Sequence, residues 1–148
     1  MERITRQEVQ KLSHNFQVRF ALFCTYQVKD RWDKTPSCIE AVKIVELWLD
    51  GRASSEECRV AAHAADCAVG SVGGVVVSYT AFAAANVSNA GACAADYNAG
   101  ACACTASAAA GGYAGTSKDK VIKEQWDFYN ELLHFDEIVE KALLGEEI

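Results

Sequence analysis

The residues best suited to chemistry lie in an alanine-rich run near the middle of the chain. His63 and Cys67 are four residues apart, so on a helix they would lie one turn apart and could form a Cys–His nucleophile pair. Asp66 is the one nearby candidate for the orienting third group. All three would share one helix, and no pattern beside them marks an oxyanion donor. We therefore interpret His63 as a core histidine with its hydrogen bonds satisfied, and we expect no catalytic residue.

The cysteines offer a second candidate chemistry, which is metal binding. Cys102 and Cys104 form a C-x-C pair, and Cys93 precedes them. A metal site needs several converging ligands, usually with a wider C-x₂₋₄-C spacing. On a helix, residues two apart point about 200° away from each other. We therefore expect buried, reduced thiols, no metal and no cofactor. His14 and His134 belong to charged amphipathic segments, so we expect them near the surface.

Two groups of residues are candidates for contact with a partner. Trp32 lies in the charged connector 29–34 next to Arg31, and an exposed tryptophan in such a place would be a candidate binding hot spot. The alternative is that Trp32 folds back over the end of the preceding helix. The second group is acidic, and it is either a solvated face or a surface for a basic partner. It comprises Asp136, Glu137 and Glu140.

Charge and composition exclude several function classes. The net charge is −6, and no basic run is present, so we expect no direct contact with nucleic acid. Residues 67–117 hold one charged side chain, Asp96, which makes them resemble a membrane span. Gly, Ser, Asn, Tyr and Thr interrupt this stretch, and no run of about 18 strongly apolar residues occurs. The start of the chain is charged and amphipathic. The sequence therefore predicts a cytoplasmic protein without a membrane segment.

The elements that would position these residues are helices with clear end signals. Thr5 and Glu8 form a capping box, and apolar residues at three- and four-residue steps predict one first helix that continues to about Val28. Thr35-Pro36 starts a second helix, which ends at Gly51. Ser54 and Glu57 form another capping box, which opens a third helix through the alanine run.

The central region is harder to assign. Glycines 70, 73 and 74 indicate a break, because glycine disfavours a helix. We expect helix over 75–87, although the run of valines would also suit a strand. The composition of residues 89–114 predicts one alanine-rich helix or a pair of helices. We expect the last helix to run from Thr116 or Ser117 to Gly145. An Asn-Ala-Gly-Ala-Cys-Ala repeat recurs at 89 and 98. The whole pattern predicts a single all-α domain over 1–148, a compact bundle or array of five to six helices around an alanine-rich core.

The order of these parts resembles a family of alanine-rich helical proteins from bacteria and phages, some of which are described as immunity proteins. The resemblance is carried by residues 20–28, 39–51, 54–58 and 61–65 and by Glu124-Gln125. It implies a helical fold and a role in conflict between phage and host, and it implies no catalytic residues.

We therefore expect a non-catalytic binding protein of phage or prophage type, an inhibitor, immunity or accessory protein that acts by protein contact. The alternatives are a structural homo-oligomer and a small-molecule binder with a pocket inside the helical array. The residues that would line such a pocket are His63, Tyr79, Tyr97 and Tyr113. A polar-lined pocket would favour the last alternative, and an exposed apolar or acidic patch would favour the first interpretation.

Overall fold

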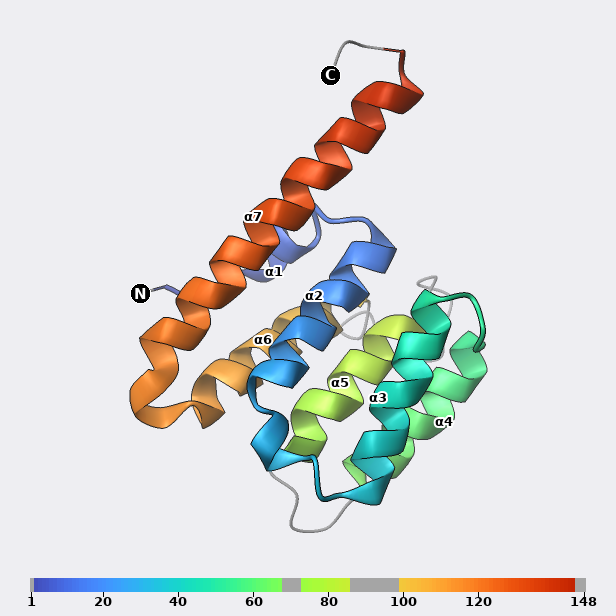
Figure 1. Cartoon of the computed structure of the whole chain (residues 1–148), viewed down its shortest axis with the longest axis vertical. Coiled ribbons are helices and arrows are strands. Elements are labelled where there is room, and N and C mark those ends of the chain that lie inside the picture. Colours follow the sequence, from blue (N-terminus) through green and yellow to red (C-terminus); the bar gives the residue numbers. More distant parts are fainter. Residues whose placement is uncertain (1, 68–72, 86–98, 146–148) are drawn as a thin grey trace.

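The computed structural model describes residues 2–67, 73–85 and 99–145, and these residues form α-helices joined by turns and short 3₁₀ segments, without a strand (Figure 1). The all-α prediction is confirmed. The helices are α1 (Arg6–Val9), α2 (His14–Gln27), α3 (Pro36–Leu49), α4 (Ser55–Asp66), α5 (Gly73–Ala85), α6 (Ala99–Tyr113) and α7 (Lys118–Leu143).

The predicted first helix is in fact two helices, so the prediction of one continuous helix to Val28 is wrong. The capping box of Thr5 and Glu8 is present, but α1 ends at Val9, and Ser13 begins α2 as its N-cap. The side-chain amide of Gln17 stabilises this break, because its Nε2 donates to the carbonyls of Val9 at 3.3 Å and Leu12 at 3.1 Å. The Gln17 side chain thus adds a donor to backbone carbonyls at and after the end of α1, where a helix lacks its usual i+4 partners.

The next two helices begin and end as their cap residues predict. Pro36 stands in the first turn of α3, and Gly51 follows its end with a φ of +74°, a conformation that glycine adopts easily. The Ser54 hydroxyl accepts a hydrogen bond from the backbone N–H of Glu57, and the Glu57 carboxylate accepts one from the backbone N–H of Ser54. Local sequence signals therefore define the end of α3 and the start of α4.

The central region is helical over the part that the structure describes. Helix α5 covers residues 73–85, so the preference for helix over strand is confirmed there. Gly73 and Gly74 lie in the first turn of α5 instead of breaking the chain. Gly70 and the first copy of the repeat lie outside the described residues. The second copy opens α6.

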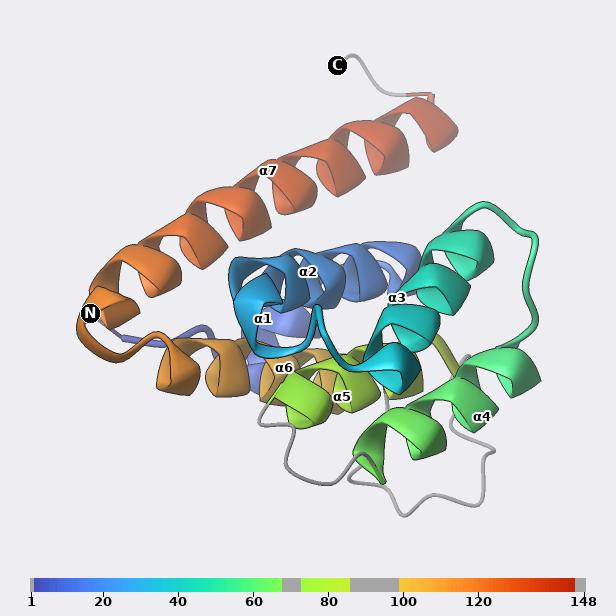
Figure 2. The ribbon, with the colours of Figure 1, turned by 60° about the horizontal axis from the view of Figure 1, so that its bottom comes forward.

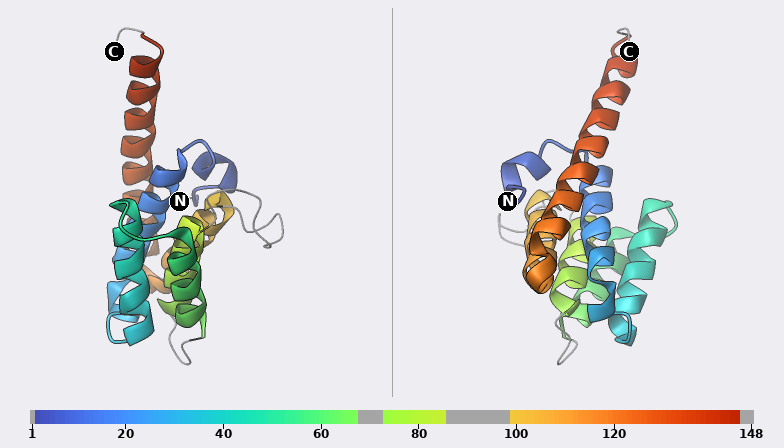
Figure 3. Two further views of the ribbon diagram at one scale, coloured as in Figure 1. Left: turned by 90° about the vertical axis from the view of Figure 1, so that its right-hand side faces the viewer. Right: turned by 60° about the vertical axis from the view of Figure 1, so that its left-hand side comes forward.

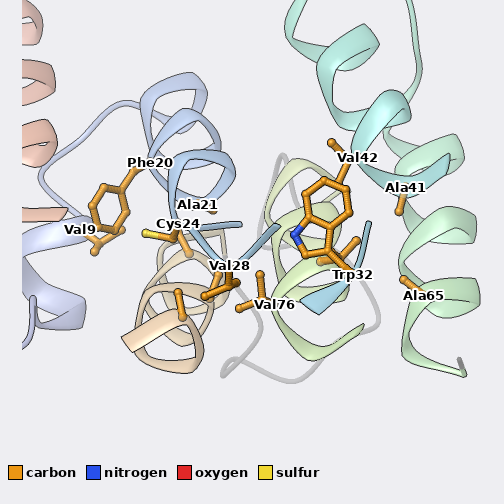
Figure 4. Close-up of a cluster of buried hydrophobic side chains, with 14 of the residues drawn as sticks. Val9, Phe20, Ala21, Cys24, Val28, Trp32, Ala41, Val42, Ala65 and Val76 are labelled. Carbon is orange, nitrogen blue, oxygen red and sulfur yellow. The ribbon is translucent and has the colours of Figure 1, made fainter. Parts of the chain in front are cut away.

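Helix α5 lies at the centre of the array, with contacts to α2, α3, α4 and α6 (Figure 2). Small side chains allow helices to approach closely, and Thr25 on α2 meets Thr80 on α5 through a 2.7 Å hydrogen bond between their hydroxyls. Figure 4 shows part of this core around Phe20, Trp32 and Val76. The buried alanines are Ala21, Ala41, Ala61, Ala62, Ala65, Ala81, Ala83, Ala84, Ala85, Ala101, Ala103, Ala106 and Ala110.

Helix α7 follows a 3₁₀ turn (Gly115–Ser117) and ends before Gly145, close to the predicted bounds. It runs antiparallel to α2, since Phe23 of α2 stacks on Phe128 and Phe16 contacts Phe135. Gln125 is fully buried, and its amide donates to Gln27 Oε1 and to the Ser107 carbonyl, which ties α7 to α2 and α6. Among the described helices, none is long and apolar enough to cross a membrane.

Candidate protein-contact surface

The end of α7 extends beyond the rest of the molecule (Figure 1, Figure 3). We call residues 135–144 the arm. Three large apolar side chains follow one another along it at steps of four residues, and all are exposed: Phe135 by 56%, Val139 by 42% and Leu143 by 83%. On a helix this spacing places the three on one side. The arm therefore presents an apolar row to solvent.

A groove between α2 and α7 leads into this row. Its volume is about 470 Å³. Aromatic rings form much of its wall, since Phe23 and Phe128 stack with ring centroids 4.5 Å apart, and Phe16 and Phe135 lie 5.7 Å apart. The residues that line it are Asn15, Phe16, Arg19, Phe128, Glu131, Leu132 and Phe135. Groove and arm share Phe135, so a mainly apolar surface leads from one into the other, which is typical of protein contact sites.

A hydrogen-bonded contact fixes the base of the arm. The Asp136 carboxylate accepts hydrogen bonds from the Ser13 backbone N–H at 2.9 Å and from the Ser13 hydroxyl at 3.1 Å. Ser13 is the N-cap of α2, so α7 supplies the acceptor that caps the neighbouring helix. Asp136 thus has a structural role in the fold, whereas Glu137 and Glu140 are exposed on the arm.

The N-terminal segment is held against the first half of α7, near its middle. The Trp126 indole N–H donates to the Glu2 carbonyl at 2.9 Å, and the Tyr129 hydroxyl donates to the Glu8 carbonyl at 2.8 Å. Burial raises the pKa of Tyr129, so this phenol stays a donor over the neutral range. These contacts anchor the first part of α7 and leave the arm as its exposed part.

The prediction of Trp32 as an exposed hot spot is wrong. Its side chain is only 3% exposed, and its indole N–H donates to the Thr25 carbonyl at 2.8 Å, at the end of α2. The alternative, in which Trp32 folds back over that helix, is confirmed. Tyr26 packs edge-on against the Trp32 ring. Arg31, at the end of the 3₁₀ turn Lys29–Arg31, is exposed.

His63 is exposed on α4, so its interpretation as a core histidine is also wrong. The His63 ring contacts the Phe82 ring edge-on, with the ring centroids 5.1 Å apart. The Tyr79 ring also contacts Phe82 edge-on, with the ring centroids 6.5 Å apart. Asp66 and Cys67 are exposed at the end of α4. The pocket prediction is left untested, because Tyr97 and the Tyr113 side chain lie outside the described part of the chain.

His14 is half-buried instead of lying free on the surface. Its Nε2 donates to the Ala83 carbonyl at 2.8 Å, and its ring meets Trp48 edge-on at 5.1 Å. His14 therefore links the start of α2 to α5 and α3. His134 is exposed on α7, as predicted.

The six thiols that the structure describes show no arrangement suited to catalysis or metal binding. None of the six described cysteines forms a disulfide, and within the described ranges no three metal-ligand side chains converge. Burial raises the pKa of Cys24 and Cys104, and it raises that of Cys58 to about 11. Thiols with raised pKa values are poor nucleophiles at neutral pH. Cys93 lies outside the described residues.

Sequence reasoning missed the residues that form the groove and the arm. Phe135, Val139 and Arg19 were not among the candidates. The signal that could have identified Phe135 and Val139 is the apolar spacing of the last helix, which continues almost to Gly145, whereas no pattern in the sequence indicates Arg19.

Comparisons with known proteins add no assignment. No protein-family model, no curated protein and no solved structure matches the chain. The resemblance to the alanine-rich family therefore stays a prediction.

Proposed function

We propose that this chain is a non-catalytic binding protein that acts by protein contact through the arm of α7. The observation that carries the proposal is the exposed apolar row of Phe135, Val139 and Leu143. Exposed large apolar side chains arranged on one helical face, next to an apolar groove, are typical of helix-mediated recognition.

The energetics favour covering this row. Burial of apolar surface contributes about 25 cal/mol per Å², so one fully buried leucine or phenylalanine contributes about 1.5–3 kcal/mol. Three such side chains in one row can therefore supply the central part of a binding interface. Glu140 is exposed beside the row, and Glu137 is exposed on the opposite side of the helix, so these charges would add electrostatic selectivity more than affinity.

The kind of binding protein is a narrower proposal. The resemblance described above supports an inhibitor, immunity or accessory protein of phage or prophage type in the cytoplasm. Glu137 and Glu140 would then contribute to partner binding, and Arg31, which follows the C-terminal end of α2 while the arm lies near its start, would belong to a second contact. We expect the partner to be a protein and not a nucleic acid.

The test compares the unmodified chain with two variants, in each of which one exposed valine is replaced by lysine. Val139→Lys places a charge in the apolar row, whereas Val60→Lys makes the same change on α4, where Val60 is 62% exposed. Each chain is cross-linked in a lysate of its source cells, and the bound proteins, a second copy of the chain included, are identified by mass spectrometry. We expect one stoichiometric protein with the unmodified chain and with Val60→Lys, and its loss with Val139→Lys. Equal recovery with both variants would refute the proposal.

A further inference from the structure

A cavity lies beside the N-terminal segment, at the end of α7 that is opposite to the arm. Its volume is about 620 Å³, within the range of about 300–1,000 Å³ that is usual for small-molecule sites. Residues 2–5, α6 and the first residue of α7 enclose it. The residues that line it are Glu2, Arg3, Ile4, Thr5, Cys104, Ala108 and Lys118. The cavity is therefore separate from the groove and the arm.

The lining has an apolar inner part and a charged rim. Ile4 is only 3% exposed, and Cys104 and Ala108 are half-buried, so these three side chains form the inner wall. Arg3 and Lys118 are exposed, so they lie where the cavity opens to solvent. A molecule with an apolar body and a charged end matches this division.

The backbone is fixed on both sides of Arg3. The Trp126 indole N–H donates to the Glu2 carbonyl at 2.9 Å, and the Cys104 thiol donates to the Ile4 carbonyl at 3.8 Å. Arg3 lies between these two anchored residues. Its guanidinium is therefore held beside the cavity before any ligand arrives, which lowers the entropy cost of binding.

The cavity is electropositive, although the chain carries a net charge of −6. Burial raises the pKa of the Cys104 thiol, and the positive charges of Arg3 and Arg6 oppose this rise, so both charges act on the inner wall. Lys118 adds a positive charge at the rim. It begins α7, whose dipole makes this end positive, and the Ser117 side chain does not cap it.

The charges of the lining leave one positive charge uncompensated. Within the described part of the chain, neither Arg3 nor Lys118 forms an ion pair. Glu2 supplies the opposing carboxylate of the lining. The Thr5 hydroxyl is already bonded within the capping box with Glu8. One negative charge would therefore neutralise the lining, and a dianion would exceed this balance.

We propose that this cavity binds a small monocarboxylate with a short apolar body. Its carboxylate would lie between Arg3 and Lys118, and its body would cover Ile4, Cys104 and Ala108. A guanidinium suits this role because its planar N–H groups match the two oxygens of a carboxylate. The proposal goes beyond contact through the arm and does not depend on it.

The first experiment uses Cys104 as a reporter of occupancy. Each thiol of the intact chain is labelled with iodoacetamide, and the rates are read from peptide masses while hexanoate is titrated at constant ionic strength. At about ten times its dissociation constant, hexanoate should slow labelling of Cys104 about tenfold, because mainly the empty cavity then reacts. Exposed Cys67, at the end of α4, should keep its rate. An unchanged rate at Cys104 up to saturating hexanoate would overturn the proposal.

Charge variants test which side chains hold the carboxylate. Arg3→Gln and Lys118→Gln should each weaken binding about fivefold, since each removes one attractive charge. Glu2→Gln should strengthen binding, because it removes the opposing charge. Lys120→Gln is the matched control, since it makes the same change at an exposed position of α7 outside the lining. Equal binding by Arg3→Gln, Lys118→Gln and Lys120→Gln would refute the site.

A panel of probes tests the class of ligand. Hexanamide has the same body without the charge, acetate has the charge without the body, and inorganic phosphate supplies a dianion. We expect each of the three to protect Cys104 less than hexanoate does. Equal protection by hexanamide would overturn the role of the cations, and equal protection by acetate or phosphate would overturn that of the apolar wall.

The variant Val139→Lys separates this proposal from the proposed function. It changes the arm and leaves the cavity intact, so it should bind hexanoate as the unmodified chain does. Loss of hexanoate binding in Val139→Lys would contradict the assignment of the ligand to this cavity.

Discussion

Replacing Asp136 by alanine tests whether α7 caps α2. Two donors of Ser13 meet this carboxylate, the backbone N–H and the hydroxyl. The same pair of donors occurs at Thr5, where the backbone N–H and the hydroxyl both meet the carboxylate of Glu8. In the first helix the acceptor comes from three residues away, whereas α2 takes its acceptor from a helix 123 positions along the chain. Asp136 therefore couples the start of α2 to the base of the arm.

The magnitude follows from the environment of this contact. Hydrogen bonds to a charged group contribute about 1.5–3 kcal/mol when shielded, but water can replace them at a partly exposed site. Loss of an N-cap interaction costs about 0.5–2 kcal/mol, so we expect Asp136→Ala to lower the free energy of unfolding by about 1–2 kcal/mol. For a domain of this size, each kcal/mol of lost stability lowers the Tm by about 2–4 °C.

The assay is urea and thermal unfolding followed by circular dichroism, with Glu137→Ala as the matched control. Glu137 is exposed on the neighbouring position, and its loss should change stability by less than about 0.5 kcal/mol. Ser13→Ala combined with Asp136→Ala should cost less than the two single changes together, because both remove the same hydrogen bond. Equal stability of Asp136→Ala and Glu137→Ala would refute the capping role.

Three further changes test the core. Trp32→Ala should lower the unfolding free energy by about 3–5 kcal/mol in urea, and a loss below 1 kcal/mol would contradict its burial. Gln125→Leu should cost about 2–4 kcal/mol in the same assay, since the buried Ser107 carbonyl and the half-buried Gln27 Oε1 both lose a donor; an unchanged midpoint would exclude this network as a stabilising one. At pH 8, iodoacetamide should label exposed Cys67 first and Cys24 only after unfolding, as peptide masses would show. Equal labelling rates would contradict the burial that raises the pKa of Cys24.

Much of the fold could be predicted because local signals define most helix ends. The Thr5–Glu8 and Ser54–Glu57 capping boxes and Gly51 all act within a few residues of themselves. The break between α1 and α2 could not be predicted in this way. The contacts that stabilise this break come from Gln17 and from Asp136, which lies far along the chain. A local sequence pattern cannot indicate a contact between residues so far apart in the sequence.

The candidate site was predicted less well, because exposure depends on tertiary contacts. The charged neighbours of Trp32 suggested an exposed ring, yet the carbonyl of Thr25 at the end of α2, which also accepts the Val28 backbone N–H, provides a partner for its indole inside the core. His63 lies among alanines, but the alanines of α4 that are buried occupy one face, and His63 lies on the other. Residue type and neighbours therefore indicated the wrong environment in both cases.

The wrong prediction of one continuous first helix and the failure to identify the arm of α7 have one cause. A first helix continuing from residue 6 to 28 would be long enough to cover nearly all of α7, so the apolar spacing of α7 would read as buried throughout. Because the chain breaks before His14, α2 has 14 residues and α7 has 26. At about 1.5 Å per residue, α7 is then longer by roughly 18 Å, which is the length of about twelve residues. Ser13, bonded to Asp136, marks where α2 begins beside α7. The break at the start of α2 thus leaves the arm exposed, and the apolar row beyond Asp136 becomes available to a partner.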